Sequence, residues 1–310
     1  SLEFLFKVRN GLHLITKKKQ DKLILDYIPE LTKLLKLKNQ TVLIKKTLQS
    51  MQTIHQFSAI TVSKVLRKHR IKKENITLFR SKRFTTNIYI CNNKIYTRFN
   101  IKPFALHTLL EFLILLPENI TKFDPSFHDL IAKTIIPDKI ESNTYMLVKE
   151  LYNKINIYSI FKVLYDNKIL RIIVHPLRKI LYLAQFDGYH NYAVDLHSLH
   201  CLKALENIRD SRVKIIYDSL DKENKQLLNL IVLIHDSGKG RKEDHSEVGA
   251  NLFKVYAKHL NFTKDEIDIG VNLIRYHTHM SSLPFKQDIH HDNTVLKFIA
   301  KLKTKLKIDM

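Results

Sequence analysis

Hydrophobic residues in the first seventy positions recur every three or four residues, the spacing of one face of an α-helix. The first series spans 2–15, the second runs from Leu23 to Leu35, and the third extends from Val42 to His69. The pattern predicts three amphipathic helices in succession.

The period changes to two between residues 76 and 99. Two alternating segments, 87–91 and 94–99, flank the dipeptide Asn92-Asn93, and asparagine tolerates the left-handed backbone that a tight hairpin turn needs. A short β-hairpin is therefore predicted near 87–99. From Pro103 to Leu183 the helical pattern returns, with prolines at 117, 125, 137 and 176 as interruptions. Residues 1–185 are expected to form a mainly α-helical domain with this hairpin inserted.

The composition changes at residue 186. Ten of the sixteen histidines and five of the six glycines lie between 186 and 291. Glycines mark sharp backbone turns, and histidines gathered with aspartates mark candidate metal or acid–base chemistry. We expect residues 186–310 to form a second helical domain that carries the chemistry, so the whole chain is mainly all-α.

Charge is distributed unevenly along the 310 residues. Residues 1–185 contain 33 Lys and Arg against 13 Asp and Glu, which accounts for +20 of the total charge of +22. Two explanations stay open: a basic face for an anionic partner, or lysine-rich codon usage on solvated faces. Because no RNA-recognition motif or zinc finger is present, a nucleic-acid partner is not expected.

The two cysteines, Cys91 and Cys201, are too far apart in the sequence for a disulfide framework, a zinc ribbon or an iron–sulfur site. They suit a reducing compartment. No apolar run reaches the roughly 18 residues that a membrane span needs. A cytoplasmic protein without a membrane partner is expected.

The strongest chemical signal is the pair His235-Asp236, which follows the apolar segment 227–234. A carboxylate at the end of a buried helix is costly unless a cation meets it. The glycines at 238 and 240 would end that helix, and Asp244 is placed to cap the next one, with His245 in its first turn. His197 and His277, on separate amphipathic helices, are the further candidate ligands. A set of imidazoles and carboxylate without thiolates favours one or two divalent ions such as Mg²⁺ or Mn²⁺.

A family resemblance appears in three longer strings. The first is Tyr189-His-x-Tyr-x-Val-Asp-x-His197; the second is His235-Asp-x-Gly-Lys-Gly-Arg241 with Asp244-His-Ser-x-x-Gly249; the third is His277-x-x-Met-Ser281. Their histidine–aspartate pattern resembles the HD phosphohydrolase superfamily. Together they resemble the HD domain of the bacterial PII uridylyltransferase/uridylyl-removing family, and the segment 4–31 is similar to the helical region that follows that family's nucleotidyltransferase core.

The resemblance implies hydrolysis of the tyrosyl-O-UMP phosphodiester on uridylylated PII protein. A divalent metal held by His197, His235, Asp236, His245 and His277 would activate water, and Lys239 would bind phosphate oxygens beside the catalytic carboxylate of Asp236. The family's nucleotidyltransferase core and its C-terminal sensing domains, through which glutamine is expected to act, have no counterpart in these residues. The chain is thus expected to be a central fragment.

One element of the family's metal site has no counterpart. HD domains add a further Asp from a later helix, and the sequence offers no convincing match before Met310, since Asp309 lies in a lysine-rich tail. We therefore expect a C-terminally truncated HD domain. Two alternatives stay open: an HD-type phosphohydrolase of free nucleotides, and a non-catalytic scaffold that docks PII protein through its basic half.

Overall fold

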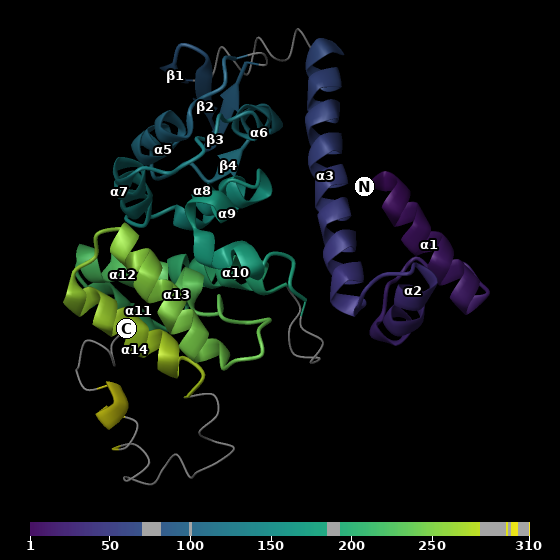
Figure 1. Cartoon of the computed structure of the whole chain (residues 1–310). Coiled ribbons are helices and arrows are strands. Elements are labelled where there is room, and N and C mark those ends of the chain that lie inside the picture. Colours follow the sequence, from purple (N-terminus) through teal and green to yellow (C-terminus); the bar gives the residue numbers. More distant parts are fainter. Residues whose placement is uncertain (70–81, 99–100, 185–192, 280–295, 297–298, 303–309) are drawn as a thin grey trace.

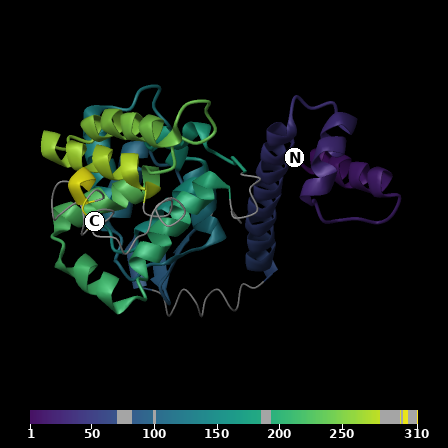
Figure 2. The same ribbon diagram turned by 90° about the horizontal axis from the view of Figure 1, so that it is seen from below.

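The computed structural model describes residues 1–69, 82–98, 101–184, 193–279, 296, 299–302 and 310. A main body combines a small sheet with surrounding helices, and one long helix, α3 (Gln40–His69), stands beside it. Two views at right angles place α1 (Leu2–Thr16) and α2 (Ile28–Leu34) on the far side of α3 from this body (Figures 1 and 2).

The N-terminal helices form a small core of their own. It contains the buried residues Val8, Leu12, Ile28, Leu31 and Leu43. The expected first and third helices are present as α1 and α3. The second helix was predicted too long: Ile24 is extended, residues 25–27 form a 3₁₀ turn, and α2 begins only at Ile28 with Pro29 in its first turn. Proline favours that position because it has no amide hydrogen to leave unpaired.

The predicted hairpin is present as β2 (Ile88–Cys91) and β3 (Lys94–Thr97), which pair antiparallel. Asn92 and Asn93 both adopt the left-handed conformation, with φ of 50° and 58°, as a two-residue hairpin turn requires. The sequence analysis missed two outer strands. β1 (Lys82–Thr85) pairs with β2, and β4 (Lys122–Phe123) runs parallel to β3, giving the order β1-β2-β3-β4.

Helices α5 to α9 pack around this sheet and below it (Figure 1). Their bounds are α5 (Leu106–Leu115), α6 (Pro125–Ala132), α7 (Ser142–Leu151), α8 (Ile157–Asp166) and α9 (Leu170–Ile173), followed by a 3₁₀ turn, η2 (His175–Lys179). The prolines act as predicted at two boundaries: α5 ends before Pro117, and α6 begins at Pro125, capped by the Asp124 side chain, which accepts the Ser126 amide.

The C-terminal helices form the lower part of the body. They are α10 (Val194–Glu206), α11 (Ser211–Ser219), α12 (Lys222–Ile234), α13 (His245–His259) and α14 (Lys264–Tyr276). One continuous hydrophobic core runs from Ile88 in the sheet to Ile274 in α14. The mainly helical fold class is confirmed, whereas a division into domains at residue 186 stays a prediction. Among the described residues, no helix combines the length and apolar character needed to cross a membrane.

Candidate metal centre

Asp236 lies at the middle of the candidate site. The buried face of α12 carries the chain into the core, and the helix ends at Ile234, so that His235 and Asp236 emerge at its C-terminal end. The Asp236 residue is only 2% exposed. A carboxylate buried to this degree is stable as an anion only when positive charge or hydrogen-bond donors surround it.

Three imidazoles from three parts of the chain face this carboxylate. The Nε2 atoms of His235 and His197 lie 3.4 and 3.8 Å from its Oδ2 atom. The Nε2 atom of His277, which follows α14, lies 3.5 Å from Oδ1. The convergence that the sequence analysis expected from α10, α12 and α14 is therefore present in the fold.

The backbone fixes which ring nitrogen points inward. His235 donates its Nδ1 hydrogen to the carbonyl of Val232 at 2.8 Å, and His277 donates its Nδ1 hydrogen to the carbonyl of Ile274 at 2.6 Å. A carbonyl oxygen can only accept, so Nδ1 carries a proton, and Nε2 is the ring nitrogen that faces the centre and can bind a cation there. Such hydrogen bonds to backbone carbonyls are typical of metal-ligating histidines.

Lys239 adds a positive charge to the same carboxylate. Its Nζ atom lies 2.9 Å from Asp236 Oδ2, and its side chain is 14% exposed. Burial opposes ionisation of Asp236, but hydrogen bonds from His235 and His277 and the charge of Lys239 outweigh it, so the pKa of Asp236 lies well below its ordinary range. Asp236 is therefore a carboxylate at neutral pH.

His245 joins the cluster from the N-terminus of α13. Asp244 caps this helix as predicted, accepting the amides of Ser246 and Glu247 at 2.8 and 3.2 Å. The ring centroid of His245 lies 5.5 Å from that of His277. Burial, followed by the proximity of His277, lowers the pKa of His245 and keeps the imidazole neutral.

This donor set fits a divalent cation. The Nε2 atoms of His235 and His277 lie 3.4 and 3.5 Å from the carboxylate oxygens of Asp236, and imidazole nitrogens and carboxylate oxygens are both ligands of divalent first-row cations. The ligand atoms of His235, Asp236 and His277 all lie within 4.8 Å of one another. Moreover, the buried Nε2 atom of His245 has no hydrogen-bond partner among the described residues.

The sequence analysis missed one residue at this site. The Cys201 Sγ atom lies 3.5 Å from His197 Nε2, and the ligand atoms of His197, Cys201 and His235 form a second group within 4.8 Å. A thiol group therefore lies beside the predicted ligands, which the sequence analysis did not expect. The spacing of four residues between His197 and Cys201, which puts both on one side of a helix, was the available signal.

Other residues of the recognised strings have structural roles or lie elsewhere. Asp195 is buried beside α8 and accepts hydrogen bonds from the Tyr165 hydroxyl and the Tyr182 amide, each at 2.9 Å. Arg241 donates to the carbonyl of Ser237 at 2.6 Å and so supports the turn after α12. Six residues named in the strings or as a possible ligand lie outside the described residues: Tyr189, His190, Tyr192, Met280, Ser281 and Asp309.

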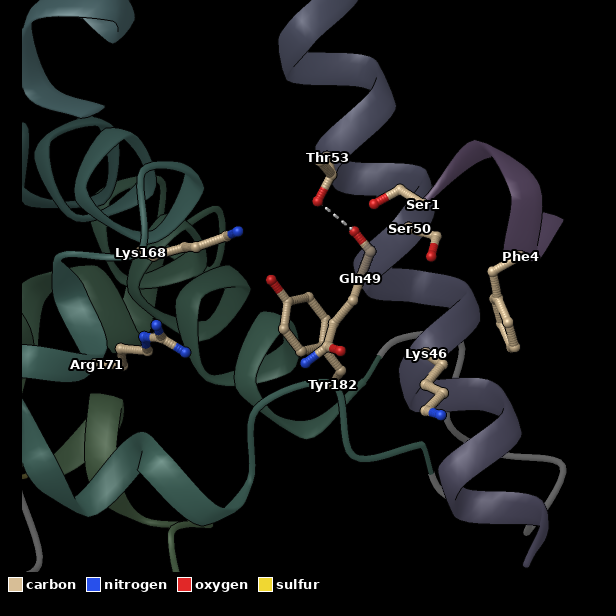
Figure 3. A pocket seen from close by; sticks show the side chains of 9 residues that line it. All are labelled: Ser1, Phe4, Lys46, Gln49, Ser50, Thr53, Lys168, Arg171 and Tyr182. Carbon is tan, nitrogen blue, oxygen red and sulfur yellow. Dashed lines mark hydrogen bonds between the residues drawn. The ribbon is translucent and has the colours of Figure 1, made fainter. Parts of the chain in front are cut away.

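A separate basic cleft lies between α3 and the main body. Its volume is about 430 Å³, and Figure 3 shows Lys168 and Arg171 on the body facing α3, with Tyr182 between them and Lys46. Within the described part of the chain, no carboxylate forms an ion pair with Lys46, Lys168 or Arg171. Part of the N-terminal charge excess is therefore concentrated at one concave surface.

Comparison with known proteins first defines the class of the site. Residues 194–304 match the family model described as HD domain, and this range contains all six predicted site residues. The C-terminal helices are thus similar to HD domains.

The particular relatives are bifunctional enzymes. Residues 1–62 match the family model of GlnD PII-uridylyltransferase. Two proteins named bifunctional uridylyltransferase/uridylyl-removing enzyme, from Cereibacter sphaeroides and Ruegeria pomeroyi, are each 32% identical to this chain over 147 residues. The matched region covers 46% of this chain and 16% of each relative. Hence the resemblance recognised from the sequence is confirmed at partial coverage.

Proposed function

We propose that the cluster around Asp236 is a divalent-metal centre that hydrolyses phosphodiesters, and that its substrate is a tyrosyl-O-UMP group on PII protein. The observation that carries this proposal is the inward orientation of the His235 and His277 Nε2 atoms toward a buried carboxylate. The substrate is suggested by the names of the similar enzymes, which include uridylyl removal.

The residues that would hold the cation are His197, His235, Asp236, His245 and His277, with Mg²⁺ or Mn²⁺ as the expected ion. A bound divalent ion would supply Lewis acidity that activates water and polarises the phosphoryl group. Asp236 would neutralise part of such an ion's charge, and the backbone hydrogen bonds of His235 and His277 hold their Nε2 atoms toward the centre.

Lys239 is proposed to bind the substrate's phosphate oxygens. Its ammonium group already lies in the centre, held by Asp236. With a cation bound to Asp236, this ammonium would be free to stabilise the negative charge that develops on the phosphoryl oxygens. The tyrosinate leaving group, with a pKa of about 10, needs little help from an acid.

The test is UMP release from uridylylated PII protein, measured by mass spectrometry with Mn²⁺ present. Asp236→Asn keeps the shape of the side chain and removes its charge, and we expect it to lower the rate roughly 100-fold or more. Asp218→Asn, on exposed α11, is the matched control and should leave the rate unchanged. Equal rates for Asp236→Asn and the original chain would contradict the proposal. Hydrolysis of free nucleotides alone would favour the nucleotide phosphohydrolase alternative.

A second candidate function, docking of PII protein without turnover, is favoured by the basic cleft. Charge contacts there would be screened by salt, so binding should weaken steeply between low and physiological ionic strength. Arg171→Gln should weaken binding, whereas Arg212→Gln, which removes the same charge from exposed α11, should not. Binding of PII protein that is insensitive to both salt and Arg171 would exclude the cleft as the docking surface.

A further inference from the structure

Cys201 forms part of a ligand group that overlaps the centre described above. Helix α10 places Cys201 one turn after His197, and the two side chains meet at 3.5 Å between Sγ and Nε2. His235 completes this group from the end of α12. The described structure therefore contains two candidate triads, His197–Cys201–His235 and His235–Asp236–His277, which share one imidazole.

The two triads differ in the chemistry of their ligands. Both contain imidazoles, but the carboxylate of one suits harder ions such as Mn²⁺, whereas a thiolate in the other selects thiophilic ions such as Zn²⁺. We propose that Cys201 is a metal ligand, and that it makes the His197 side of the centre a binding site for Zn²⁺ or a similar thiophilic divalent ion. The inference deepens the proposed function, because it rests on the same metal centre.

The observed distance agrees with shared coordination. Zinc binds sulfur at about 2.3 Å and imidazole nitrogen at about 2.0–2.1 Å, so two such ligands at a tetrahedral angle are about 3.5–3.6 Å apart. The separation of Cys201 Sγ and His197 Nε2 is 3.5 Å. When the metal–sulfur bond forms, the thiol S–H bond breaks and its proton leaves to solvent, with no change in the oxidation state of sulfur or metal.

Sharing of His235 has a functional consequence. Because its Nδ1 atom donates to the Val232 carbonyl, His235 has a single lone pair, on Nε2, and can bind one cation at a time. An ion bound by Cys201, His197 and His235 would therefore leave only Asp236 and His277 of the second triad to bind another ion. Zn²⁺ is expected to antagonise Mn²⁺-supported hydrolysis, and Cys201→Ser should reduce that antagonism roughly tenfold or more.

The decisive experiment uses Co²⁺ as a spectroscopic substitute for Zn²⁺ in the full chain. A thiolate ligand gives a near-ultraviolet sulfur-to-cobalt charge-transfer band, which imidazoles and carboxylates do not give. We expect this band in the original chain and in Cys91→Ser, whose thiol lies in β2, and its loss in Cys201→Ser with the visible cobalt bands retained. Should Cys201→Ser fold poorly by circular dichroism, Cys201→Ala replaces it.

Each other outcome overturns the inference in a distinguishable way. Visible cobalt bands without the charge-transfer band in the original chain would show a metal centre that Cys201 does not join, with the proposed function intact. A charge-transfer band that persists in Cys201→Ser would place the thiolate elsewhere. No cobalt binding at all would overturn both this inference and the metal centre, and the Mn²⁺-dependent release of UMP should then fail as well.

Discussion

Gly238 has no side chain, and this lets the turn after α12 lie directly against the backbone of the first turn of α13. A Cβ atom at this position would lie 1.8 Å from the carbonyl oxygen of His245 and 2.7 Å from the amide nitrogen of Gly249. Ordinary van der Waals contact begins at 3.4 Å, so Gly238→Ala requires the start of α13 to move by about 1.6 Å. Backbone atoms cannot turn aside as a flexible side chain can, and His245 would be carried away from the centre with them.

The cost of this movement combines two effects. Overpacking typically costs about 1–3 kcal/mol, and loss of the Asp244 cap, which holds the displaced turn, costs about 1 kcal/mol more. We therefore expect Gly238→Ala to lower the free energy of unfolding by about 2–4 kcal/mol, measured by urea unfolding with circular dichroism. Mn²⁺ affinity, measured by calorimetry, should fall in the same variant.

Gly249→Ala provides the matched control for Gly238→Ala. Its nearest neighbour outside the helix is the carbonyl oxygen of His235 at 3.2 Å, which a small shift relieves, and alanine favours the helical backbone by about 1 kcal/mol. The stability of Gly249→Ala should stay within about 1 kcal/mol of the original chain. If Gly238→Ala were as stable as Gly249→Ala and bound Mn²⁺ normally, the close approach of the two backbones would not position His245.

Two further predictions concern buried carboxyl groups. Asp195→Ala leaves the Tyr165 hydroxyl and the Tyr182 amide without their acceptor in the core, so urea unfolding should show a loss of about 2–5 kcal/mol; an unchanged midpoint would refute this role. Burial raises the pKa of Glu206 to about 7 against the opposing effect of the Tyr158 amide, so the folded chain keeps a proton that the unfolded chain loses above pH 4.5. Stability relative to Glu206→Gln should therefore fall as pH rises from about 4.5 to about 7, by roughly 1–2 kcal/mol once partial exposure is allowed for; a difference independent of pH would contradict it.

The sequence predicted correctly those turns and helix ends that depend on only a few neighbouring residues. Asn92-Asn93 predicted the hairpin because left-handed backbone is a property of the residues themselves, and Asp244 predicted the start of α13 because a cap acts over three residues. β4 was missed because a strand of two residues has no period, and it exists only where β3 offers a partner. The start of α2 was misplaced because apolar spacing continues through the extended residue Ile24.

In the candidate centre, too, the sequence predicted what local chemistry determines and missed what depends on packing between helices. The residues His235 and Asp236 could be predicted from a carboxylate at the end of an apolar helix. Their inward orientation could not, because it depends on hydrogen bonds to backbone carbonyls and on how α10 and α14 pack against α12. Cys201 was dismissed because cysteines were considered only as a pair, although its spacing from His197 already put both on one helix face.

The central claim is that imidazoles from separate helices hold a divalent cation beside Asp236. Crystals of the chain grown with Mn²⁺ would test it most directly through an anomalous difference map. The account predicts a peak within coordination distance of Asp236 and the Nε2 atoms of His235 and His277. A map with no peak at Asp236, in crystals that bind Mn²⁺ elsewhere, would contradict it.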